Sequence, residues 1–167
     1  MGGINCPPPS YAGDDLPRIR GEYIRELAHY CKSLFGGVSK FFAANAKIEV
    51  AILDGDDISG ALTLLKQSKA DFIEAQSYLG TVGALISTMA PNDNINIAVQ
   101  VEYLGSIMEK IDTCYMDLDV LSSRVSLQES IWAHEDITHN LVGAVEEIVG
   151  ALTWQNEFAT TRTLVTG

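Results

Sequence analysis

The stretch SIWAHEDITHN, residues 130–140, places two histidines among acidic side chains. Asp136 and His139 are three residues apart, and Glu26 and His29 repeat that spacing near the start of the chain. On a helix, a spacing of three brings both side chains onto one face. Carboxylates and histidines placed in this way hold metal ions in the cores of helical bundles. The first question is therefore whether this chain builds a metal site.

The direction of these side chains argues against a metal site. At 100° per residue, Asp136 and His139 lie far from the apolar stripe of their helix, and His29 lies far from its own stripe. A ferritin-like di-metal centre needs about six inward ligands, whereas only His134 falls on a core row. We therefore expect no cofactor, and we interpret His134 as a buried histidine that holds the register of the helices. The alternative is a metal ion or small ligand bound by His134, Glu26, His29, Asp136 and His139.

Four long helices are expected to position these residues. Asp15 is a good N-cap, and an apolar face runs from there to the DGDD segment at 54–57, with an expected bend at Gly36 and Gly37. Two seven-residue repeats follow, separated by Pro91 and the polar segment 92–94. The repeats are Ile58, Leu65, Phe72, Leu79 and Ile86 beside Ala61, Ser68, Ala75, Val82 and Met89, then Ile97, Leu104, Ile111, Leu118 and Val125 beside Val101, Met108, Tyr115 and Ser122.

A capping box, Ser126 with Glu129, predicts the start of a fourth helix that runs from about Leu127 to beyond Trp154. Its expected inward residues are Ile131, His134, Leu141, Val145, Ile148 and Leu152. Helices of roughly 30–38 residues joined by short connections must lie antiparallel to their neighbours. The sequence therefore predicts an all-α protein, an antiparallel up-down-up-down four-helix bundle with long helices. The bundle occupies residues 15–160, between a flexible tail at 1–14 and a frayed end at 161–167.

Two tryptophans and two glycines of the fourth helix indicate an association surface. Trp132 and Trp154 fall on its outer arc, and Gly143 and Gly150, seven residues apart, fall on the same face. A glycine within a helix costs about 0.5–1 kcal/mol relative to alanine, so two glycines in register need a reason. Close packing of a second helix beside exposed aromatic side chains is one such reason. We expect a homo-oligomer, preferably a dimer through this helix, or another protein partner; the alternative is that the large side chains only cover the corners of the bundle.

The composition limits the other classes of partner. Eleven basic and twenty-two acidic residues give a net charge of −11, which repels nucleic acid and anionic lipid. No apolar run approaches the roughly 20 residues that span a bilayer, and no signal peptide is visible. The three cysteines are odd in number and lack CxxC spacing, so the cytoplasm is the default location.

Short motifs add little. Gly2 with Cys6 is typical of acylated N-termini, and PPSY at 8–11 fits the pattern that WW domains bind, but both suit a plain flexible tail. No P-loop, GxSxG or GxGxxG motif occurs. We therefore expect a non-enzymatic helical-bundle interaction protein that self-associates or serves as an adaptor or assembly subunit. The alternative is a metal- or small-ligand-binding bundle of ferritin-like character.

Overall fold

The computed structural model describes residues 15–54, 57–90, 96–123 and 127–166, with side chains left undescribed at 52–54, 123, 127–131 and 161–166. These residues form four helices: α1 (Asp15–Asp54), α2 (Ser59–Met89), α3 (Ile97–Ser123) and α4 (Leu127–Thr166). The described part of the chain contains no strand, so the predicted all-α helical bundle is confirmed. The last helix continues to Thr166, beyond residue 160, after which the sequence suggests a frayed end.

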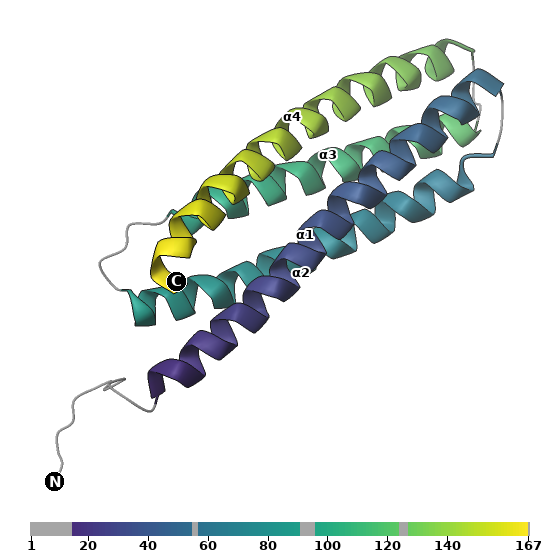
Figure 1. Cartoon of the computed structure of the whole chain (residues 1–167). Helices are drawn as coiled ribbons and strands as arrows, with labels where there is room; N and C mark the ends of the chain where they lie inside the picture. The colour runs from purple at the N-terminus through teal and green to yellow at the C-terminus, as the bar shows by residue number, and fades with distance from the viewer. Residues whose placement is uncertain (1–14, 55–56, 91–95, 124–126, 167) are drawn as a thin grey trace, which may run out of the picture.

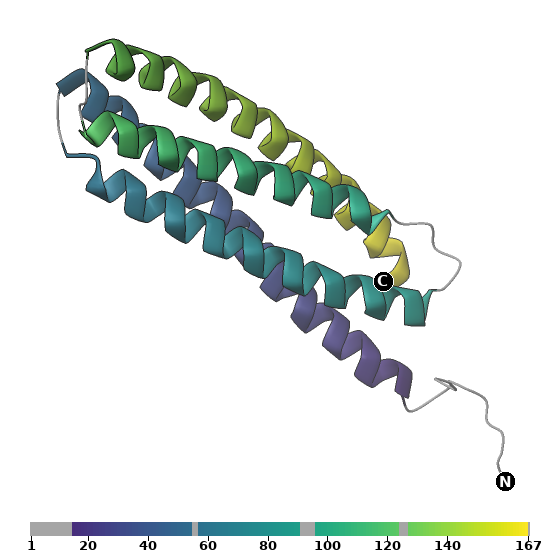
Figure 2. The same ribbon diagram turned by 180° about the vertical axis from the view of Figure 1, so that it is seen from behind.

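The chain reverses direction at each connection, as Figures 1 and 2 show from opposite sides. Side-chain contacts also show that neighbouring helices are antiparallel, because residues with higher numbers on one helix contact residues with lower numbers on the next. Between α2 and α3, for example, Gln76 binds the carbonyl oxygen of Val101, whereas the earlier Lys69 binds the later Asp112. The helices therefore run up, down, up and down.

The bundle is assembled from two helical hairpins. The helices α1 and α2 pack closely along their length, and so do α3 and α4. Contacts between α2 and α3 join the hairpins, whereas α1 and α4 barely touch each other. All four helices nevertheless contribute to one core, whose largest fully buried side chains include Tyr30, Phe41, Phe72, Leu104 and Ile111. The bundle is thus closed on three sides and less tightly closed on the fourth.

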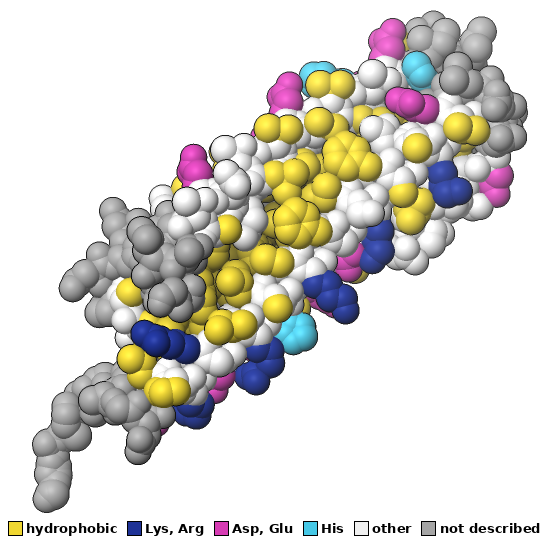
Figure 3. Space-filling model, viewed as in Figure 1, with side chains coloured by type: hydrophobic (Ala, Val, Ile, Leu, Met, Phe, Trp, Pro, Cys, Tyr) yellow, Lys and Arg dark blue, Asp and Glu magenta, His cyan; other side chains and the backbone are white. Residues whose placement is uncertain are grey.

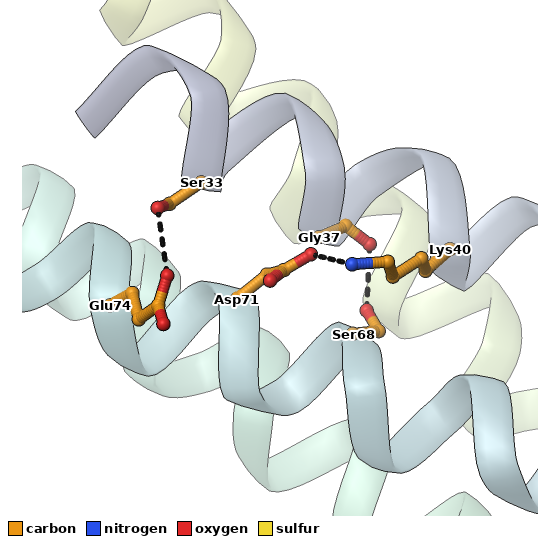
Figure 4. Close-up of polar contacts among 6 residues, drawn as sticks. All are labelled: Ser33, Gly37, Lys40, Ser68, Asp71 and Glu74. Atoms are coloured by element: carbon orange, nitrogen blue, oxygen red, sulfur yellow. Dashed lines mark hydrogen bonds and ion pairs between the residues drawn. The ribbon is translucent and has the colours of Figure 1, made fainter. Parts of the chain in front are cut away.

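At Gly37, a side chain of α2 packs directly on the backbone of α1. A Cβ atom added at Gly37 would lie 3.0 Å from the ring of Phe72, so the phenyl group rests directly on the α1 backbone. One turn earlier on α2, the buried Ser68 hydroxyl donates a hydrogen bond of 2.7 Å to the Gly37 carbonyl oxygen (Figure 4). The missing side chain of Gly37 allows the two helices to approach each other here.

Polar side chains hold the same pair of helices together at the rim. Lys40 Nζ lies 2.6 Å from Asp71 Oδ2, and the Ser33 hydroxyl donates to Glu74 Oε2 at 3.3 Å (Figure 4). Both pairs are partly buried, so solvent screens them less than it screens exposed pairs. These bonds fix the register of the first hairpin.

The predicted core rows are right for α2 and only partly right for α3. In α2, both seven-residue rows are buried from Ala61 to Ile86. In α3, Leu104, Ile111 and Leu118 are buried as predicted. The second buried row lies three residues after the positions of the predicted first row, whereas the sequence pattern places it four residues after them. This second row consists of Gln100, Ile107 and Cys114, in place of the predicted Val101, Met108, Tyr115 and Ser122.

The predicted inward face of α4 is wrong by part of a turn. Leu141 and Ile148 are buried as expected, but His134 is exposed. The buried companions are mainly small: Ala133, Ile137, Ala144, Ala151 and Phe158. The apolar stripe of α4 is wider than the part of the helix that packs in the core. When the centre of this stripe is judged from the large side chains, it falls to one side of the residues that are buried.

Candidate functional site

The predicted metal ligands do not come together. Glu26 and His29 lie on α1, where the His29 ring stacks on Tyr78 of α2 with the ring centroids 5.1 Å apart. The three candidates on α4 are all exposed: His134, Asp136 and His139. Among the side chains that the structure describes, no group of three histidine, cysteine, aspartate or glutamate residues is placed to hold a metal ion. The interpretation of His134 as a buried, register-setting histidine is also wrong, because the core lies beside it at Ala133 and Ile137.

The two glycines of α4 lie against α3 of the same chain. A Cβ atom added at Gly150 would lie 2.5 Å from the Tyr103 ring, and one added at Gly143 would lie 3.1 Å from the Lys110 side chain. Side chains of α3 thus cover both glycines within the chain. A second helix does pack closely on them, as the sequence indicates, but that helix is α3.

The two tryptophans differ in their surroundings. Trp154 is half-buried and stacks on Phe158, with the ring centroids 4.9 Å apart and the rings 13° from parallel. Trp132 is 56% exposed. A role in association stays a prediction for Trp132, whereas the contacts of Trp154 explain its position within the bundle.

A buried polar cluster joins α1, α3 and α4 at the first turn of α3. Gln100 Nε2 donates to the Tyr30 hydroxyl oxygen at 2.8 Å and to the Ala151 carbonyl oxygen at 3.1 Å. Nearby, Gln155 Nε2 points at Cys31 Sγ at 3.8 Å. Burial raises the pKa of Tyr30, which keeps its hydroxyl neutral at ordinary pH. The sequence interpretation missed Gln100, although its place three residues after Ile97 on the heptad pattern would have revealed it.

This cluster is not fully satisfied. The side-chain oxygens of Gln100 and Gln155 are buried and have no hydrogen-bond partner among the described residues. An unpaired buried amide oxygen costs on the order of 1–3 kcal/mol. The cluster therefore contributes more to fixing which helices meet at this level than to net stability.

The two described thiols are poor candidates for nucleophilic catalysis. Burial raises the pKa of Cys31, and burial with the nearby charge of Asp117 raises the pKa of Cys114 to about 12. Since the thiolate is the reactive form, both side chains stay protonated at neutral pH. Their positions in and beside the core indicate a packing role.

Large apolar side chains are exposed on the two helices that barely touch. On α1 these are Ile24, Phe35, Phe42 and Val50, and on α4 they are Trp132, Val142 and Val149. Phe35 and Phe42 are 52% and 44% exposed and, seven residues apart, lie on one row of the helix. Cys31 precedes Phe35 by four residues and faces Gln155 of α4, which places this row on the side of α1 nearest α4.

We call this surface the α1/α4 face: the five exposed side chains Ile24, Phe35, Phe42, Val142 and Val149, with the half-buried Leu27, Cys31, Val145 and Leu152 between them. Figure 3 shows it as a continuous band of hydrophobic side chains along the line between α1 and α4. Monomeric proteins rarely expose large contiguous apolar patches without a binding role. The α1/α4 face is the strongest candidate functional site of the molecule.

Charged residues are distributed unequally on the two sides of this face. The helix α1 carries six of the eleven basic residues of the chain together with five acidic residues, so its charges nearly balance. The helix α4 carries six acidic residues and a single arginine. In Figure 3, basic side chains lie along the edge beyond α1 with acidic side chains between them, whereas acidic side chains lie along the opposite edge, beyond α4. The apolar band thus separates a margin of mixed charge, which holds most of the basic side chains, from an acidic margin.

Within the described helices, no stretch combines the length and the apolar character that a bilayer crossing requires. Comparisons with protein-family models, with curated proteins and with solved structures found no match. The α1/α4 face must therefore be interpreted from its own geometry and chemistry.

Proposed function

We propose that this chain is a non-enzymatic interaction protein, which associates with another polypeptide through the α1/α4 face. The exposed row of Phe35 and Phe42 is the observation that carries the proposal. Two half-exposed phenyl rings beside exposed valines leave apolar surface in water, at a cost of about 25 cal/mol per Å² relative to burial. A partner that covers the face removes this cost, which favours association.

The spacing of the exposed side chains favours a helical partner. Phe35 and Phe42 are seven residues apart on α1, and so are Val142 and Val149 on α4. Rows with this repeat are the surface into which another helix packs its own side chains. Self-association and an adaptor or assembly role both use such a surface. The net charge of −11 disfavours nucleic acid as the partner.

The test places a charge on the face and compares the resulting complexes. Val149→Glu puts a carboxylate in the middle of the apolar band, at a side chain that is 56% exposed and so tolerates the change in the free protein. Met116→Glu, on the exposed side of α3, adds the same charge away from the face. Each protein is purified from its natural source by affinity and measured by native mass spectrometry.

We expect wild type to retain a second polypeptide, either another copy or a different chain. Val149→Glu should lose this polypeptide, because burying an unpaired carboxylate is costly, and Met116→Glu should retain it. Equal retention by Val149→Glu, or a wild-type protein without any associated polypeptide, would refute the proposed function.

A further inference from the structure

The two helices that border the α1/α4 face are held at a defined relative height. Gln155 on α4 points at Cys31 on α1, and Gln100 connects Tyr30 on α1 with Ala151 on α4. These contacts set Tyr30 and Cys31 level with the turn between Ala151 and Gln155. Since α1 and α4 run in opposite directions, each step forward along α1 from this level corresponds to a step back along α4 (Figure 1).

This register places the exposed phenylalanines of α1 level with the exposed valines of α4. Phe35 comes level with the turn of α4 that holds Val149, and Phe42 comes level with the turn that holds Val142. Both pairs repeat after seven residues, or about 10 Å along a helix. The face thus consists of a protruding aromatic row on α1 and a lower β-branched row on α4, with matching spacing at matching heights.

A surface of this kind is complementary to itself. Consider a two-fold axis that runs parallel to the helices and lies in the plane of the α1/α4 face. Rotation about this axis keeps each residue at the same level along the helices, and it places α1 of one copy opposite α4 of the other. The aromatic row of each copy then meets the valine row of its partner. Each α1 also meets an antiparallel α4, which is the relation it has within its own chain.

The charges select this arrangement over the other two-fold arrangement. An axis perpendicular to the helices would place α1 on α1 and α4 on α4, and so bring the two acidic margins of α4 together. The parallel axis instead places the acidic margin of α4 opposite the α1 margin, where most of the basic side chains lie. At physiological salt, charges within about 8 Å of each other still interact, so this pairing offsets the repulsion between two acidic chains.

The size of the face is compatible with a dimer. Its five exposed side chains offer on the order of 500 Å² of apolar surface, judged from their exposed fractions and usual areas. The half-buried side chains between them and the adjoining margins extend this toward the roughly 800 Å² per partner that a stable interface buries.

We infer that the partner on the α1/α4 face is a second copy of this chain, related by a two-fold axis parallel to the helices. This inference rests on the proposed function and adds the identity and the orientation of the partner. Phe35 of each copy then lies against Val149 of the other, and Phe42 lies against Val142.

Cysteine cross-linking between separately labelled chains tests the arrangement. The background protein carries Cys6→Ser, Cys31→Ala and Cys114→Ala, and single cysteines are added by Phe35→Cys or Val149→Cys. Each variant is incubated alone or mixed with the other, treated with a short bismaleimide, and separated on a denaturing gel. Met116→Cys mixed with Val149→Cys serves as the control, because Met116 lies on α3, away from the face.

We expect the mixture of Phe35→Cys and Val149→Cys chains to give covalent dimers at least tenfold in excess of either variant alone and of the control. Dimers formed equally by Phe35→Cys alone would overturn the inference, since they place α1 against α1. Native mass spectrometry of wild type separates this inference from the proposed function. A monomer that instead retains a different polypeptide, lost on Val149→Glu, would overturn the second-copy inference and leave the proposed function standing.

Discussion

At the scale of single residues, Gln100 joins three helices through its one amide group. It donates to the Tyr30 hydroxyl and to the Ala151 carbonyl, while its own oxygen has no partner among the described residues. Such a group stabilises the fold little, yet its removal leaves other buried groups unpaired. Gln100 and Tyr30 should therefore behave as a coupled pair.

Replacement of Gln100 tests this coupling. Gln100→Leu leaves the fully buried Tyr30 hydroxyl without its partner and should lower the free energy of unfolding by about 1–3 kcal/mol. The double variant Tyr30→Phe/Gln100→Leu removes both polar groups and should be less destabilised than the sum of the single variants. Urea denaturation of the four proteins measures the coupling, and strict additivity would argue against the shared hydrogen bond.

Asp117 gives the molecule a small pH dependence. Partial burial, with the nearby Asp136, raises its pKa in the folded state, and the bond from Asn140 only partly offsets this. The folded state therefore binds the proton more tightly than the unfolded state. The carboxylate destabilises the fold fully above the folded pKa, and this effect vanishes as the pH falls below the unfolded value of about 3.9.

Asp117→Asn should accordingly raise the free energy of unfolding at pH 7, by less than about 1 kcal/mol because the side chain is largely solvated. At pH 3.5 the difference from wild type should disappear. Urea denaturation at both pH values checks this, with the exposed Asp119→Asn as the matched control. A gain that persists unchanged at pH 3.5 would contradict the assigned cause.

At the scale of elements, glycines decide how closely the helices pack. Gly150 lies under the Tyr103 ring and Gly37 lies under Phe72, whereas Gly80 has open space around its α carbon. The sequence shows only that glycines are present in the helices. Which helix covers them depends on the order of neighbours, which a single heptad pattern does not contain.

Two glycine-to-alanine changes separate these situations. Gly80→Ala should stabilise the protein by about 0.5–1 kcal/mol, because alanine favours the helix and meets no neighbour. Gly150→Ala places a methyl group 2.5 Å from the Tyr103 ring, so it should destabilise the protein by about 1–3 kcal/mol despite the same helix preference. Thermal or urea unfolding measures both changes. A stabilising Gly150→Ala would mean that α3 and α4 are not in close contact there.

The elements also show what the sequence could predict. The seven-residue rows of α2 identify its core because large and small residues alternate on one clear stripe. The stripe of α4 misleads because alanines form much of its buried row, while Val142 and Val149 are equally apolar but exposed. Hydrophobicity alone does not distinguish an apolar side chain packed in the core from an exposed one, so the sequence pattern places His134 on the wrong side.

At the scale of the whole molecule, the two hairpins share a core but leave the side between α1 and α4 apolar and exposed (Figure 3). The total apolar content indicates more hydrophobic surface than four narrow stripes require. Where this additional hydrophobic surface lies follows only from the packing of the helices, because it depends on which pair of helices is least in contact. The exposed apolar side chains of α4 that adjoin α1 lie on the flank opposite the glycines, so our proposal places association there rather than at Gly143 and Gly150.

Sedimentation velocity over a range of concentrations tests self-association through this face most directly. Wild type should sediment with twice the mass of the 18.1 kDa chain, as should Met116→Glu, whereas Val149→Glu and Phe42→Glu should sediment as helical monomers. Circular dichroism confirms that the monomeric variants stay folded. A wild-type protein that remains a monomer at every concentration, or a Val149→Glu variant that remains a dimer, would contradict this account.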